Sequence, residues 1–145
     1  MAIQSLSHRL PLLTPEDIER LERVFEQHPQ IQAVYLFGSA ASGRIHYESD
    51  IDLGIVPAPG ATLLKLDILA DLAKAGFDYI DVVILETDDI LLKWEVVRPN
   101  RLVYQTSDFD RGDYFSRIMR QYFDFLPYLE TQRKAYKRRA LRGQA

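Results

Sequence analysis

Two aspartates at the start of an apolar run constrain the fold of this 145-residue chain more than any other feature. Asp50 and Asp52 lie two residues apart, and the residues that follow, up to Val56, are otherwise apolar, which predicts a buried strand over residues 50–56. Side chains two apart on a strand point to the same face, so the two carboxylates lie together. Like charges placed in this way repel each other unless a cation binds them. The pattern therefore predicts a buried strand that binds a divalent cation.

The remaining periodicity predicts an α/β protein with a small mixed sheet of three to four strands flanked by helices. The other predicted strands are residues 31–37, 79–85 and 101–105, the last a short edge strand. One predicted helix begins after Thr14. The other predicted helices cover residues 63–75, 89–98, 107–126 and 128–142, with a kink or break at Pro127. We expect one domain over residues 1–145, with a core at about 14–105 and C-terminal helices at about 107–142.

A third carboxylate, Asp81, lies within the otherwise apolar strand 79–85. If this strand neighbours strand 50–56, Asp81 joins Asp50 and Asp52 to hold two metal ions about 3.5–4 Å apart, an arrangement that clamps the attacking and leaving oxygens of an in-line phosphoryl displacement. Oxygen ligands favour Mg²⁺, with Mn²⁺ as a second possibility. Asp78 competes for this role, but it lies three residues from Asp81 at the strand entrance and is more typical of a turn.

A Gly38-Ser39 pair follows the predicted strand 31–37, and ten residues separate Ser39 from Asp50. Glycine lets the backbone approach a phosphate closely, and the Ser39 hydroxyl with nearby backbone N–H groups can hold an anion. Arg44 lies in the spacer and is a candidate positive contact for a triphosphate. Together with the aspartates, these residues predict a nucleotidyl-transfer site.

The charge of the chain is unevenly distributed. The net charge of −3 divides into +6 from Arg117 onward and −9 over the preceding residues. This division suggests that the basic C-terminal segment binds an acidic partner surface. The chain has no cysteine, and no apolar run approaches the roughly 18 residues of a membrane span, so we expect a cytoplasmic protein without membrane contact.

The ordered set of Gly38-Ser39, a ten-residue spacer, Asp50-x-Asp52 and a later strand aspartate resembles the signature of the DNA polymerase β-type nucleotidyltransferase superfamily. It is most similar to the minimal nucleotidyltransferases, called MNT proteins, which pair with HEPN toxins in toxin–antitoxin modules. The resemblance extends over roughly residues 14–129.

This resemblance implies an antitoxin that transfers AMP from ATP to a tyrosine hydroxyl of a HEPN RNase toxin, with release of pyrophosphate. It implies that Gly38 and Ser39 bind the triphosphate and that Asp50 and Asp52 bind metal. Asp81 would then be the third metal ligand and the activator of the nucleophile.

Three alternatives remain open at this stage. The acceptor could be a small molecule, as in aminoglycoside nucleotidyltransferases, although the chain leaves little room for a drug pocket. The protein could neutralise its toxin by binding alone, or it could modify tRNA. The sequence lacks the interleaved aromatic and basic residues of a single-strand platform, so direct binding of nucleic acid is not expected.

Overall fold

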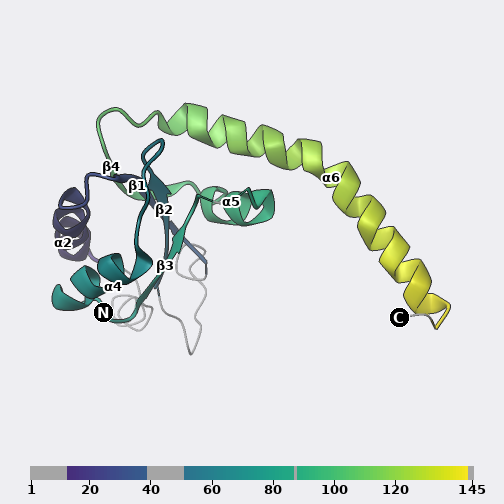
Figure 1. The fold of residues 1–145 in the computed structure, drawn as a ribbon, viewed down its shortest axis with the longest axis horizontal. Helices are drawn as coiled ribbons and strands as arrows, with labels where there is room; N and C mark the ends of the chain where they lie inside the picture. The colour runs from purple at the N-terminus through teal and green to yellow at the C-terminus, as the bar shows by residue number, and fades with distance from the viewer. Residues whose placement is uncertain (1–12, 39–50, 87, 144–145) are drawn as a thin grey trace, which may run out of the picture.

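The computed structural model describes residues 13–38, 51–86 and 88–143 of the chain (Figure 1). Within them, four strands form one mixed sheet, as the sequence predicts, and their order in the sheet is β3-β2-β1-β4. The strands are β1 (Ile31–Phe37), β2 (Ile51–Pro57), β3 (Ile80–Ile84) and β4 (Arg101–Gln105). The helices are α2 (Pro15–Glu26), α4 (Lys65–Lys74), α5 (Ile90–Val97) and α6 (Arg111–Leu141).

The strand directions follow from the connections between them. β1 runs antiparallel to both of its neighbours, β2 and β4. β2 and β3 are parallel, and the connection between them contains α4, because parallel neighbours need a crossover long enough to return the chain to the same end of the sheet. The residues at the starts of β2 and β3 therefore lie at the same end.

Helices cover both faces of the sheet, α2 and α4 on one side and α5 with the first part of α6 on the other (Figure 1). Alternate strand residues supply the two cores, as the period of a strand requires. In β1, Val34 and Leu36 pack with α2 and α4, whereas Tyr35 and Phe37 pack with α5 and α6. In β2, Gly54 leaves room for α5, because a Cβ at that position would overlap Val96 Cγ1.

The two predicted C-terminal helices form one continuous helix, which agrees with a kink rather than a break at Pro127. One helix, α6, begins at Arg111 rather than at residue 107, with the Asp110 side chain as its N-cap, and it continues through Pro127. Proline removes one backbone donor, but its fixed φ is compatible with a helix, so the chain bends without ending it. Figure 1 shows α6 changing direction near its middle. No helix in the described part of the chain combines the length and apolar character needed to cross a bilayer.

Tyr35 is fully buried on the α5 and α6 side of the sheet, where its ring packs on Phe109 and Tyr114. Among the described residues, its hydroxyl is the one buried side-chain polar atom without a hydrogen-bond partner. Burial raises the pKa of Tyr35 to about 12, and the neighbouring Tyr114 adds to the rise while Arg111 opposes it. The neutral phenol is therefore favoured in the folded state.

We expect Tyr35→Phe to leave the free energy of unfolding at neutral pH unchanged or up to about 2 kcal/mol higher, because the substitution removes a buried hydroxyl that forms no hydrogen bond. Urea unfolding measures this change. Tyr104→Phe, at a partly exposed position in β4, is the control for loss of a phenol hydroxyl.

The same variant tests the raised pKa. In the wild type, the phenol is neutral in both states below pH 10, so its contribution is complete there. As the pH rises from 10 to about 12, the unfolded phenol ionises first and stability falls by about 2–3 kcal/mol. Tyr35→Phe should not show this fall in the free energy of unfolding between pH 10 and 12. Identical pH dependence of stability in the two proteins would contradict the raised pKa of Tyr35.

Candidate active site

The parallel register of β2 and β3 places Asp52 directly opposite Asp81. Directly paired residues on neighbouring strands are about 4.8 Å apart and project from the same face of the sheet. This face is the one that carries Phe37, the residue paired with Asp52 on β1. The predicted strands 50–56 and 79–85 are therefore neighbours, which is the condition for a shared site, and two of the three predicted carboxylates lie side by side.

Gly38, the residue after β1, lies against the carboxylate of Asp52. Its φ is +76°, and a Cβ at this position would lie 2.5 Å from Asp52 Oδ2. Both the left-handed backbone and the close carboxylate favour glycine here. The sequence explained Gly38 only by the approach of a phosphate, whereas the structure adds a direct contact between the Gly-Ser turn and the aspartate pair.

Asp81 is the more accessible of the two aspartates, with 53% of its side chain exposed. Its Oδ1 accepts a hydrogen bond from the backbone N–H of Val82 at 2.9 Å. The same oxygen lies 3.5 Å from the Nζ of Lys65, the first residue of α4. The sequence does not reveal Lys65, because no motif signals an ion pair between a helix residue and a strand residue 16 positions apart.

The other predicted site residues are placed as follows. Asp78 lies in the turn before β3, as predicted, and not beside Asp52. Ser39, Arg44 and Asp50 lie outside the described residues.

The two juxtaposed carboxylates fit a hard divalent cation. Both donors are oxygen, they project from one face, and Asp81 is open to solvent. The described residues contain no group of three acidic, histidine or cysteine side chains that could hold a metal. A third carboxylate from Asp50 therefore stays a prediction.

Comparison with known proteins agrees with this geometry. A family model described as "Polymerase beta, Nucleotidyltransferase" matches residues 19–109, more than half of the chain. The protein adenylyltransferase MntA of Shewanella oneidensis is 30% identical over 83 residues, which are 57% of this chain. The match spans 60% of the length of that relative.

Two solved structures have a similar fold. One is a toxin–antitoxin crystallised with AMP-PNP, with a TM-score of 0.63 and 23% identity, covering 86% of this chain and 98% of the other. The second is a tri-AMPylated Shewanella oneidensis HEPN toxin in complex with an MNT antitoxin, with a TM-score of 0.55 and 24% identity, covering 87% and 94% of the two chains. At these identities, the likenesses establish the nucleotidyltransferase fold.

The contact between Gly38 and Asp52 predicts a specific cost for Gly38→Ala. The left-handed backbone costs about 1–2 kcal/mol for any residue with a Cβ, and the overlap with the carboxylate adds about 1–3 kcal/mol. Gly60 is the matched control, because it has the same φ of +76° and open space around its Cβ position. Urea unfolding should therefore show a larger loss for Gly38→Ala than for Gly60→Ala.

A double-mutant cycle identifies the source of the extra cost. Asp52→Ala removes the atoms that a Cβ at Gly38 would overlap, so Gly38→Ala should cost no more than Gly60→Ala in that background. If the cost of Gly38→Ala is the same with and without the Asp52 carboxylate, the contact is not what selects glycine.

Proposed function

Because the chain belongs to the polymerase β nucleotidyltransferase family, we propose that it is a protein adenylyltransferase and an antitoxin. It transfers AMP from ATP to a tyrosine hydroxyl of a HEPN-domain RNase toxin and thereby neutralises the toxin. The observation that carries this proposal is the in-register pair of Asp52 and Asp81, with Gly38 packed against the Asp52 carboxylate.

The relatives support the protein acceptor. The curated relative is a protein adenylyltransferase, and one structural neighbour is an antitoxin in complex with an AMPylated HEPN toxin. Another neighbour was crystallised with AMP-PNP, an ATP analogue, which supports ATP as the donor.

The proposed reaction forms one bond and breaks one. The tyrosine oxygen bonds to the α-phosphorus of ATP, the bond from that phosphorus to the bridging oxygen breaks, and pyrophosphate leaves. Asp81 accepts a hydrogen bond from the incoming hydroxyl, orients it and takes its proton, a role that fits the exposure of its carboxylate. Gly38, Ser39 and Arg44 hold the triphosphate, and Asp50 and Asp52 would hold the divalent cation beside the reacting phosphate.

Two Mg²⁺ ions held by Asp50, Asp52 and Asp81, with Mn²⁺ as a substitute, would neutralise the charge that develops on the phosphoryl oxygens.

The distal half of α6 is the surface proposed to receive the partner. It projects away from the rest of the molecule (Figure 1). The first half is held by Trp94, whose ring stacks on Tyr122 with 5.1 Å between the ring centroids. From residue 130 to residue 142 every side chain except that of Ala135 is exposed. None of the basic side chains in this segment forms an ion pair with a residue that the structure describes: Arg133, Lys134, Lys137, Arg138, Arg139 and Arg142.

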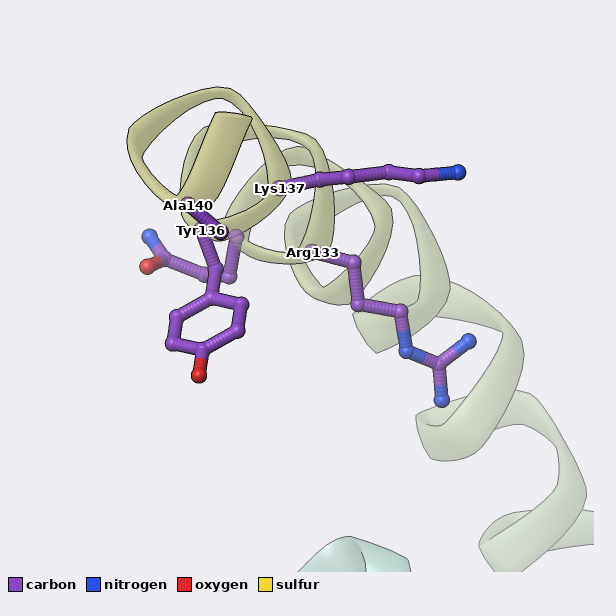
Figure 2. A pocket seen from close by; sticks show the side chains of 5 residues that line it. Arg133, Tyr136, Lys137 and Ala140 are labelled. Atoms are coloured by element: carbon purple, nitrogen blue, oxygen red, sulfur yellow. The ribbon is translucent and has the colours of Figure 1, made fainter. Parts of the chain in front are cut away.

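This segment, residues 130–142, is called the basic arm. Figure 2 shows Tyr136 and Arg133 projecting from it into open space, with Lys137 extending in another direction. Phe125, Leu129 and Tyr136 follow one another at spacings of four and seven residues, so they lie along one side of α6. An apolar stripe bordered by positive charge fits a protein surface on which carboxylates surround an apolar patch, and the proposed toxin partner is that protein.

The first test of this function concerns Asp81. Asp81→Asn should lower the rate of AMP transfer about 10²–10⁴-fold while leaving the affinity for ATP nearly unchanged, because the amide cannot accept the proton of the acceptor. Asp52→Asn should lower both the rate and the affinity. Asp78→Asn, in the turn before β3, is the matched control and should leave both unchanged.

The measurement is intact-mass spectrometry of a HEPN-domain protein incubated with this chain, ATP and Mg²⁺, with nucleotide affinity taken from calorimetry. AMP on kanamycin but not on the HEPN protein would support a small-molecule acceptor instead. Full neutralisation of the RNase by Asp81→Asn, without AMP transfer, would support an antitoxin that acts by binding alone.

The second test concerns the basic arm. Lys134→Glu combined with Lys137→Glu should slow association with the HEPN protein about tenfold at low salt and flatten the salt dependence, because electrostatic attraction mainly raises the association rate. Lys74→Glu combined with Lys93→Glu makes the same change of charge on α4 and α5 and should have a smaller effect. Surface plasmon resonance over a range of salt concentrations measures both.

Deletion of residues 134–145 provides the opposite check. If the shortened protein associates with the HEPN protein as fast as the full chain and transfers AMP equally well, the arm does not dock the partner. If the shortened protein instead no longer binds a single-stranded RNA but still binds the HEPN protein, the arm is a nucleic-acid-binding surface.

A further inference from the structure

The ion pair between Lys65 and Asp81 joins two elements on opposite sides of the sheet edge. Lys65 begins α4, which packs on the face of Val34 and Leu36, whereas Asp81 lies on β3 among residues of the other face. β3 is an edge strand, so the Lys65 side chain reaches the carboxylate past the edge. The helix that connects β2 to β3 thus brings a positive charge to the candidate active site.

This positive charge offsets an electrostatic cost of the fold. Asp81 stands directly opposite Asp52, and two carboxylates at this separation repel each other. The Lys65 ammonium and the Val82 N–H both bind Oδ1 of Asp81, which fixes the carboxylate in one orientation and partly neutralises it. A divalent cation that binds Asp52 and Asp81 therefore meets an Asp81 carboxylate whose negative charge is already paired with Lys65.

We propose that Lys65 is a built-in counter-ion of the active site, which binds Asp81 when no divalent cation is present and competes with the cation for that carboxylate. This inference rests on the proposed function, because it assumes that Asp52 and Asp81 bind a cation. It assigns to Lys65 a positioning role that the sequence motif does not contain.

The exposure of both partners makes the competition reversible. The side chain of Lys65 is 48% exposed and that of Asp81 is 53% exposed, and ion pairs between exposed groups are weak. A pair of this kind lowers cation affinity without preventing binding. It disfavours binding of a free cation, whereas a cation carried by a nucleotide brings triphosphate oxygens as additional ligands.

The test compares Lys65→Met with Lys74→Met, which removes the same charge from the last turn of the same helix. Binding of Mn²⁺ without nucleotide is measured by electron paramagnetic resonance. Lys65→Met should bind Mn²⁺ about two- to fivefold more tightly than the wild type, the range expected for loss of an exposed ion pair. Lys74→Met and the charge-preserving Lys65→Arg should change the affinity less.

Stability provides a readout that does not depend on activity. In chelator, Lys65→Met should unfold at a lower urea midpoint than Lys74→Met, and saturating Mn²⁺ should remove the difference. In an Asp81→Asn background, Lys65→Met should change neither Mn²⁺ affinity nor the midpoint, because the partner charge is absent.

The outcomes separate this inference from the proposed function. If Mn²⁺ binds the wild type and Asp52→Asn abolishes the binding, but Lys65→Met leaves the affinity unchanged or lowers it, Lys65 is not a competitor and the cation site stands. If Mn²⁺ binding is absent from the wild type, or is insensitive to both Asp52→Asn and Asp81→Asn, the cation site of the proposed function is overturned, and the counter-ion role falls with it.

Discussion

The parallel pairing of β2 with β3, in the register that sets Asp52 opposite Asp81, is the constraint on which the site depends. A parallel pair requires a crossover, and this crossover contains α4, so the connection that creates the pair also brings Lys65 to it. On the other side of β2, β1 runs antiparallel, and its last residue, Phe37, pairs with Asp52. The next residue, Gly38, therefore lies against the Asp52 carboxylate. A shift of one residue in either pairing would turn the aspartates toward the opposite core.

The carboxylates of Asp52 and Asp81 lie outside the interior of the protein. No charged side chain is buried among the described residues, and Asp52 and Asp81 lie at the start of their strands, where solvent reaches them. A fully buried carboxylate pair would cost several kcal/mol in desolvation. Tyr35 shows the cost of burying a polar group, because its hydroxyl has no hydrogen-bond partner and burial raises the pKa of Tyr35 to about 12. The carboxylates of the site therefore remain in contact with solvent.

The sequence predicted the parts of the fold that local patterns determine. Strand 31–37, the Thr14 cap of α2 and the preference for Asp81 over Asp78 follow from apolar periodicity, capping chemistry and strand parity, which act within a few residues. Features that depend on the third dimension were not predictable. The ion pair of Lys65, the contact of Gly38 with Asp52 and the orphaned Tyr35 hydroxyl need packing between distant segments. At Pro127 the sequence predicted a kink or a break, and the helix continues, because proline bends a long helix more readily than it ends one.

The basic arm is a helical segment that its own charges destabilise. A helix of 31 residues is roughly 46 Å long, and only its first half packs on the body of the molecule. In the second half, Arg133 and Lys137 lie four residues apart, as do Lys134 and Arg138, and like charges at this spacing destabilise a helix. A short helix without tertiary contacts is marginal in water, so an acidic partner surface would supply both the packing and the opposite charge that this half lacks. In the proposed function, the sheet provides the fixed geometry for phosphoryl transfer, and the arm provides the reach to a protein acceptor.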